Sequence, residues 1–251
     1  MCGIAGAIVY DQQQARLDSF VTAVNASASR GMDSFGVVRW SPASGIRRFA
    51  VLRRDDRDWL EELGRPAAGE PTIYLHTSRA EPTTEWRQEK KDFDIPPFID
   101  KGIAVAHNGI IANDHTLALN YGLSRISAID TAVLPPLIAK IGVWEAVAAI
   151  QGGAALAILD THHGILTLCR NFMPLVLAWE PGIVYFASEA GFFPDYASPF
   201  KKYQTWELPP YTGIELSVKG YRGPVLWGDQ PAWGEGESWQ SFPELRWRDN
   251  G

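Results

Sequence analysis

The sequence has very little cysteine and lacks long apolar runs. Cys2 and Cys169 are its two cysteines, whereas a secreted disulfide scaffold would normally carry more. No run approaches the roughly 18 apolar residues of a membrane span, and the residues after Met1 lack a basic region followed by a long apolar one. We therefore expect a cytoplasmic chain with reduced thiols and no membrane partner.

Basic residues are also scarce relative to acidic ones. There are 23 Lys and Arg against 29 Asp and Glu, and the formal net charge is -6. Nucleic-acid binding depends largely on clustered Lys and Arg, so we expect no nucleic-acid partner. The histidines and cysteines do not occur at zinc-ligand spacing, so we expect no metal. A hydrophobic content of 46% and a charged content of 21% fit a folded globular domain.

The first half of the chain mixes strand and helix patterns. Residues 3–10, GIAGAIVY, are small or β-branched and predict a buried strand that begins directly after Cys2. Apolar side chains at helical spacing predict a helix over 13–29 that ends before Gly31. Helices are also expected over about 130–151, where Pro135 and Pro136 must kink or restart the segment. Further strands are predicted at 36–40, 47–52, 71–78 and 101–109.

The second half is a series of short β patterns separated by turn residues. They read AALAILD, GILTLCR, PLVLAW, GIVYFAS, YQTWEL and GIELSV. Such spacing is typical of an antiparallel sheet built from hairpins. Strands and helices in this order predict an α+β fold in which sheets pack on each other with helices outside. We divide the chain into a domain at 2–219 and a Trp- and Gly-rich segment at 220–251, which either packs on the domain or docks a partner.

Cys2 is the first candidate for catalysis. It follows the initiator Met and has a small side chain, so we expect Met1 to be removed and the α-amine of Cys2 to become free. An α-amine titrates at about pH 8, so a fraction is neutral near pH 7 and can act as base for the adjacent thiol. One residue then supplies nucleophile and base. The alternative is a buried structural cysteine, which is what we expect of Cys169.

Five sequence blocks occur in one order along the chain. They are MCGIAG at 1–6, RGMDSFG at 30–36, HTSRAEPTT at 76–84, HNGIIAND at 107–114 and DTAVL at 130–134. Together they resemble the class II glutamine amidotransferase domains of glucosamine-6-phosphate synthase, asparagine synthetase, glutamine phosphoribosylpyrophosphate amidotransferase and glutamate synthase. The similarity continues into the later strands and covers roughly residues 2–217. It implies a four-layer αββα sandwich of the N-terminal nucleophile hydrolase type.

The resemblance implies a set of catalytic residues. Cys2 matches the nucleophile, Asn108 and Gly109 match the oxyanion hole, and Arg30 matches an arginine near the nucleophile. An Asn amide and a Gly backbone N–H can point at one oxygen, and glycine lets the backbone approach closely. The alternative for these two residues is a simple Asn-Gly turn. We expect His107 to orient the HNG loop, since the α-amine already serves as base.

A second set of residues is implied for substrate binding. Arg79 matches the arginine that binds the α-carboxylate of glutamine, a task that suits the two parallel donors of a guanidinium group. Asp130 matches the acid that pairs with the α-ammonium. The alternatives are a surface arginine and a helix N-cap. Thr77 and Thr83 are expected to line the same pocket, although His76 lies three residues before Arg79, where the usual spacing is two.

The implied reaction is hydrolysis of the glutamine side-chain amide through a thioester on Cys2, giving glutamate and ammonia without a metal or organic cofactor. In multidomain relatives a second domain consumes the ammonia. A chain of 251 residues leaves no room for one, so we expect a separate synthase subunit, with a stand-alone hydrolase as the alternative. Two further classes of protein share parts of this pattern. An N-terminal cysteine hydrolase of another acyl amide needs no Arg79 and Asp130 pair, and a non-catalytic docking subunit needs no intact site.

Overall fold

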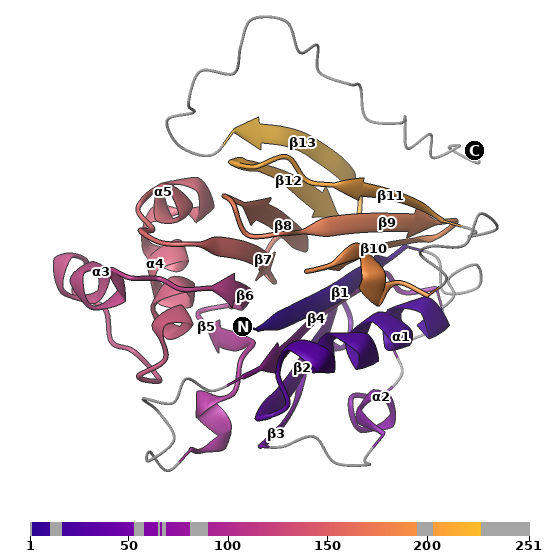
Figure 1. Ribbon diagram of the computed structural model, residues 1–251, viewed down its shortest axis with the longest axis horizontal. Helices are drawn as coiled ribbons and strands as arrows, with labels where there is room; N and C mark the ends of the chain where they lie inside the picture. The colour runs from indigo at the N-terminus through magenta and orange to yellow at the C-terminus, as the bar shows by residue number, and fades with distance from the viewer. Residues whose placement is uncertain are drawn as a thin grey trace, which may run out of the picture.

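The computed structural model describes residues 2–10, 17–52, 58–64, 66, 69–80, 90–194 and 203–226. Within these ranges two antiparallel sheets are stacked on each other, with helices on both outer faces (Figure 1). The predicted α+β fold and its four-layer αββα order are confirmed. Thr83 and most of the Trp-rich segment lie outside the described residues.

The first sheet has seven strands in the order β11-β9-β10-β1-β4-β2-β3. Strand β1 lies between β10 and β4, so the residue that precedes it, Cys2, emerges from the middle of the sheet. The bounds are β1 (Gly3–Val9), β2 (Ser34–Ser41), β3 (Gly45–Leu52), β4 (Thr72–Arg79), β9 (Val176–Glu180), β10 (Ile183–Ala187) and β11 (Gln204–Glu207).

The second sheet has six strands in the order β13-β12-β8-β7-β6-β5. They are β5 (Phe98–Asp100), β6 (Ile103–Gly109), β7 (Ala154–Asp160), β8 (Ile165–Arg170), β12 (Thr212–Ser217) and β13 (Gly220–Leu226). Strand β13 pairs with β12 and extends this sheet into the segment that the sequence analysis had set apart from 220 onward. Glycines and a proline in GYRGPVL hid this strand, because both residue types are uncommon in strands.

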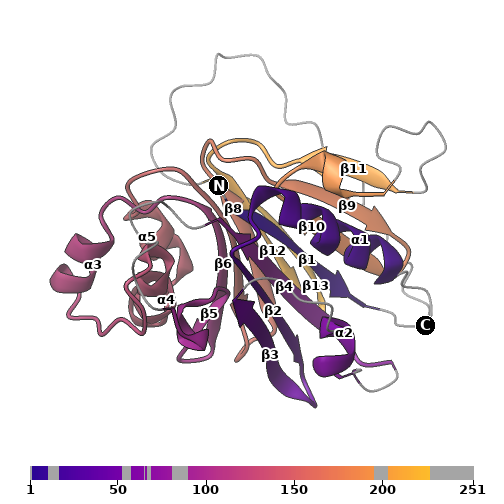
Figure 2. The same ribbon diagram turned by 60° about the horizontal axis from the view of Figure 1, so that its bottom comes forward.

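Helices cover the two outer faces of the stacked sheets (Figure 2). Helices α1 (Leu17–Ser27) and α2 (Trp59–Glu62) pack on the first sheet, and α4 (Leu134–Ile141) and α5 (Val143–Ala148) pack on the second. Helix α3 (Asp114–Asn120) follows β6. In the part of the chain that the structure describes, none of these helices has the length and apolar character needed to cross a membrane.

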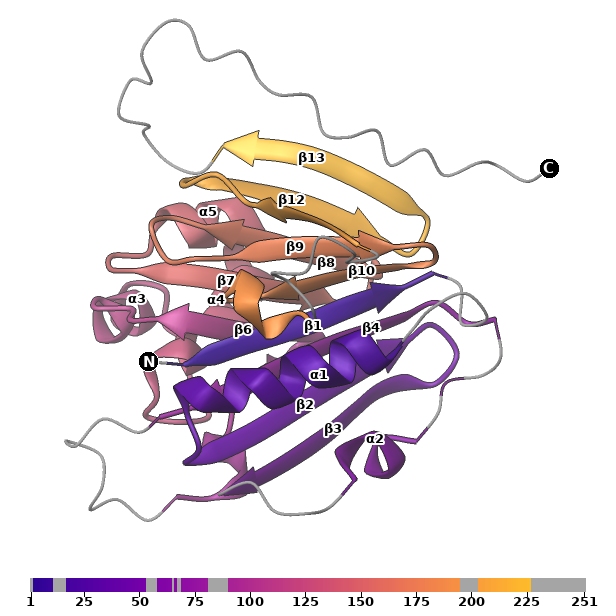
Figure 3. The ribbon, with the colours of Figure 1, turned by 45° about the vertical axis from the view of Figure 1, so that its right-hand side comes forward.

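Strand β1 illustrates how the sequence determines these layers. Successive side chains of a strand point to opposite faces. Ile4 and Ile8 accordingly join the core between the two sheets, whereas Ala5, Ala7 and Val9 join the core beneath α1. The small residues of GIAGAIV on the helix side let α1 lie close across the sheet (Figure 3).

Helix α1 and strand β1 lie in close contact at Gly3. A Cβ atom there would lie 2.6 Å from the carbonyl oxygen of Ser27, the last residue of α1. Any side chain at this position would therefore push α1 and the start of β1 apart. The residue next to Cys2 is thus fixed by helix packing as well as by the sheet.

The helical region after 130 begins with a short 3-10 helix, Asp130–Val133, and then restarts as α4. Pro135 and Pro136 lie in the first turn of α4, where a missing N–H breaks no intrahelical bond. The predicted restart at these prolines is confirmed. Helix α1 covers part of the helix expected at 13–29, and another 3-10 turn, Ala28–Arg30, follows it.

Candidate active site

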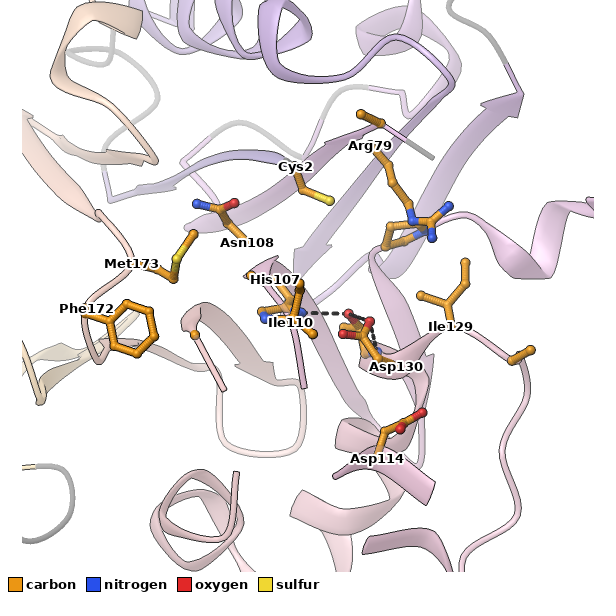
Figure 4. A pocket seen from close by; sticks show the side chains of 16 residues that line it. Cys2, Arg79, His107, Asn108, Ile110, Asp114, Ile129, Asp130, Phe172 and Met173 are labelled. Carbon is orange, nitrogen blue, oxygen red and sulfur yellow. Dashed lines mark hydrogen bonds between the residues drawn. The ribbon is translucent and has the colours of Figure 1, made fainter. Parts of the chain in front are cut away.

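A cavity of about 610 Å³ opens between the beginning of β1, the end of β4 and the end of β6. It brings together residues from distant parts of the sequence (Figure 4). The predicted site residues that line it are Cys2, Arg79, His107, Asn108, Gly109 and Asp130. They come from four of the five blocks that were recognised in the sequence.

Cys2 lines this cavity, and the backbone that follows it is held by hydrogen bonds. The Ile4 N–H donates to the Ser188 hydroxyl at 2.9 Å, and the Ser188 N–H donates to the Ile4 carbonyl, also at 2.9 Å. The Cys2 side chain itself is partly exposed. Burial raises the pKa of its thiol, and the nearby Arg79 guanidinium opposes that increase. The thiol is therefore mostly protonated near pH 7 and needs a base before it can attack.

Asn108 lies beside Cys2 and is completely buried. Neither its Oδ1 nor its Nδ2 has a hydrogen-bond partner within the described residues. A buried amide without partners is rare in folded proteins, since it costs about 1–3 kcal/mol of stability. The amide is thus available to donate to an atom that enters the cavity next to the Cys2 sulfur.

Gly109 follows Asn108 in a conformation that other residues rarely adopt. Its φ angle is 144°. A Cβ atom at this position would lie 1.9 Å from the Gly153 carbonyl oxygen, which also accepts a hydrogen bond from the Ile110 N–H at 2.8 Å. Glycine is therefore required for both its backbone angle and its close packing.

Asp130 is held by hydrogen bonds at both of its carboxylate oxygens. Oδ2 accepts from the Ile111 N–H at 2.8 Å, and Oδ1 accepts from the Thr131 N–H at 2.7 Å and the Thr131 hydroxyl at 3.1 Å. Asp130 is the first residue of its 3-10 helix, and Ile129 is the cap. The carboxylate therefore remains in the cavity with a fixed orientation.

His107 is linked to Asp130 through Thr131. The Thr131 hydroxyl donates to Asp130, so the His107 Nδ1, at 2.8 Å from that hydroxyl oxygen, must be the donor in its own bond. Burial lowers the pKa of His107, and the Asp130 carboxylate and the Gly153 backbone counteract this. The ring is thus neutral near pH 7 and connects β6 to the Asp130 segment.

Arg79 is the last residue of β4, and its side chain points into the cavity toward Asp130 (Figure 4). The residue is 6% exposed, so the alternative of a surface arginine is wrong. Gly31 packs closely against the end of β4: a Cβ atom on Gly31 would lie 2.3 Å from the Ala80 nitrogen. The cavity lining therefore carries both a cation, Arg79, and an anion, Asp130.

Other predicted site residues lie elsewhere. Arg30 forms an ion pair with Glu189 and is not part of the cavity lining. Thr77 is buried in β4, opposite Ile4, and does not reach the lining either. Because residues two apart on a strand share a face, Thr77 points to the same side as Arg79 but lies deeper between the sheets.

The structure also adds residues that the sequence analysis did not single out. Asp114, at the start of α3, lies in the lining, as do Phe172 and Met173 from the loop after β8. Phe172 and Met173 lie on the Asn108 side, away from Asp130 (Figure 4). Cys169 is fully buried in the core beneath α4 and α5, which confirms it as a core residue. Among the described residues, no cluster of His, Cys, Asp and Glu could hold a metal ion.

Comparison with known proteins links the sequence to one family. The profile of a family described as a glutamine amidotransferase domain matches residues 88–194. The chain is 32% identical over 242 residues to a 7-cyano-7-deazaguanine synthase of Saccharolobus solfataricus, an alignment that covers 86% of this chain and 48% of that protein. It is 30% identical over 207 residues to a glutamine–fructose-6-phosphate aminotransferase of Rhizobium leguminosarum bv. viciae, covering 76% of this chain and 32% of that protein.

A solved structure has a similar fold. The glutamine phosphoribosylpyrophosphate amidotransferase of B. subtilis superposes with a TM-score of 0.67 at 18% identity, covering 90% of this chain and 49% of the other. The chain thus spans about half the length of the deazaguanine synthase, 48%, and about a third of the aminotransferase, 32%.

Proposed function

Because this chain belongs to the class II glutamine amidotransferase family, we propose that its cavity binds free glutamine and that Cys2 hydrolyses the side-chain amide. The observation that carries this proposal is the Asn108 amide, which is fully buried beside Cys2 and lacks a partner among the described residues. When the Cys2 thiolate adds to an amide carbon, the negative charge moves to the carbonyl oxygen, and this oxyanion would supply the missing partner for the Asn108 Nδ2. The site is thus suited to a state that arises only during acyl transfer.

The charged end of the cavity fits the amino-acid end of glutamine. We assign the α-carboxylate to Arg79, whose guanidinium can donate two parallel hydrogen bonds, and the α-ammonium to Asp130. Both side chains line the same cavity, so one zwitterion can contact both. The amide at the other end of the substrate then extends toward Cys2.

The chemistry follows from the groups around the sulfur. The free α-amine of Cys2 takes the thiol proton, and the thiolate attacks the amide carbon. The oxyanion accepts hydrogen bonds from the Asn108 side chain and the Gly109 N–H. The amine returns its proton to the leaving nitrogen, ammonia departs, and a thioester remains on Cys2. Water then adds to the thioester carbon and releases glutamate and the free thiol.

Arg79→Ala and Asp130→Ala are expected to raise KM for glutamine by roughly 10- to 100-fold each, because a hydrogen bond to a charged group contributes about 1.5–3 kcal/mol. The turnover number should fall much less, since these contacts to the substrate are similar in ground and transition states. Steady-state assay of glutamate release measures both constants. Arg47→Ala, on the exposed face of β3, is the control. A fall in the turnover number at constant KM would contradict the assignment.

We further propose that the ammonia passes to a synthase on a separate subunit. Two observations support this destination. A relative that aligns over 86% of this chain is a 7-cyano-7-deazaguanine synthase, and the aligned region makes up 48% of it. In addition, Ile110 and Phe172 line the cavity while remaining 69% and 59% exposed, and exposed apolar side chains at a site are typical of contact with another protein.

We expect the chain alone to hydrolyse glutamine slowly and a synthase partner to raise the rate at least about tenfold, because loop ordering commonly limits turnover in such enzymes. The measurement compares glutaminase rates of the chain with and without candidate partners. A truncation after Leu226 shows whether the Trp-rich segment takes part. Full-speed hydrolysis by the lone chain, unchanged by any partner, would favour a stand-alone glutaminase.

A further inference from the structure

We propose that Arg125 is a positioning residue that holds Asp130 in the cavity and thereby determines the selectivity for an α-ammonium group. The inference rests on the proposed function and assigns a role to a residue outside the cavity lining. Arg125 belongs to none of the five sequence blocks.

The guanidinium of Arg125 connects two parts of the chain. Its Nη1 lies 2.7 Å from the Asp114 carboxylate, at the start of α3. Its Nη2 donates to the Ala128 carbonyl at 2.6 Å and to the Ile129 carbonyl at 2.9 Å. The Arg125 and Asp114 side chains are 11% and 13% exposed, so water competes little for these bonds. Arg125 thus ties α3 to the two residues directly before Asp130.

The segment that carries Asp130 needs such support. Residues 121–129 form no helix or strand, so backbone ladders do not fix them. Ser127 is a second side-chain anchor close to Asp130: its hydroxyl donates to Asp94 at 2.6 Å and accepts from the Ile129 N–H at 3.2 Å. The Asp130 carboxylate is held by the Ile111 and Thr131 N–H groups and the Thr131 hydroxyl, and the backbone directly before it is held by the contacts of Arg125 and Ser127.

Arg125 also controls the charge of the cavity. Asp114 lines the same cavity as Asp130, so a substrate ammonium meets two carboxylates there. The ion pair with Arg125 neutralises Asp114 and directs its carboxylate toward the guanidinium. Asp130 then remains as the carboxylate for the substrate, opposite Arg79. Loss of Arg125 would both loosen Asp130 and free a competing anion.

The test compares glutamine with its des-amino analogue, 4-carbamoylbutanoate, which keeps the amide and the carboxylate but lacks the ammonium. The readout is the ratio of the two kcat/KM values. We expect Arg125→Ala to lower this preference for glutamine at least about tenfold, mainly through KM for glutamine. Asp130→Ala should do the same, and the double variant should lose little more, because both changes remove one interaction.

Two more conservative variants separate a positioning role of Arg125 from a general loss of folding. Arg125→Lys can keep the pair with Asp114 but cannot hold both carbonyls in a planar fork, so it should give an intermediate ratio. Asp114→Asn should also lower the ratio. The matched control is Lys140→Ala. It removes an exposed cation that donates to the carbonyl of Tyr121, at the end of α3, at 2.6 Å. This variant should leave the ratio unchanged.

An unchanged ratio in Arg125→Lys and Asp114→Asn, or losses that are equal for the two substrates and follow a lower melting temperature, would overturn the inference and leave Arg125 with a purely structural role. Failure of the proposed function gives a different result in the same assay. In that case the unmodified chain hydrolyses neither amide, and both proposals fall together.

Discussion

Cys2→Ala is expected to lower the rate of glutamine hydrolysis by roughly 10⁴-fold or more, the scale seen when a catalytic nucleophile is removed. The loss is large because the nucleophile disappears while the α-amine is left with no thiol to activate. The fold should persist, since Cys2 is partly exposed and β1 is held from Gly3 onward by strands on both sides. Ammonia release by the purified variant, beside its melting temperature, measures both effects.

The matched control is the other cysteine. Cys169 is fully buried, and burial raises the pKa of its thiol far above the neutral range. Cys169→Ala should therefore lower the melting temperature slightly, through lost packing, while leaving turnover intact. The opposite pattern, in which Cys169→Ala is inactive and Cys2→Ala retains activity, would mean that the nucleophile had been assigned to the wrong thiol.

Asn108→Ala is expected to lower the turnover number by roughly 10²- to 10³-fold with little change in KM, because one oxyanion donor contributes about 3–4 kcal/mol to the transition state. Stability should behave differently. The Asn108 amide is buried without a partner among the described residues, so its removal relieves a desolvation cost and should not lower the melting temperature. Steady-state kinetics and thermal unfolding of the same preparation give both quantities.

Asn171 provides the matched comparison, because both polar atoms of its side-chain amide have hydrogen-bond partners. Oδ1 accepts from the Ala154 N–H at 2.9 Å and from the Phe172 N–H at 2.6 Å, while Nδ2 donates to the Gly152 carbonyl at 2.7 Å. Asn171→Ala should therefore lower the melting temperature clearly. If Asn108→Ala changed KM alone, or destabilised the protein as much as Asn171→Ala, the oxyanion assignment would have to be withdrawn.

Much of this fold could be predicted because its patterns are local. The small and β-branched residues of GIAGAIV identify β1, and the paired prolines mark the start of α4. Strand β13 could not be predicted, because GYRGPVL has a weak strand pattern and its stability comes from pairing with β12. Local propensity thus fails where tertiary contacts decide.

Some features of the site could likewise be predicted from the sequence, and others could not. Cys2 could be identified from its position after Met1, and the roles expected of Arg79, Asn108 and Asp130 came from motifs in a fixed order. The depth of Thr77 between the sheets could not be read from its spacing to Arg79. The pair of Asp114 and Arg125 joins a helix start to a loop, and only the folded chain brings the two side chains within 2.7 Å.

The central claim is that Cys2, with a free α-amine, is the group that attacks glutamine. Intact-mass analysis followed by peptide mapping, after treatment with the glutamine analogue 6-diazo-5-oxo-norleucine, tests it most directly. We predict an active protein that lacks Met1 and takes up one adduct, located on Cys2. An active protein that retains Met1, or an adduct on Cys169, would contradict the claim.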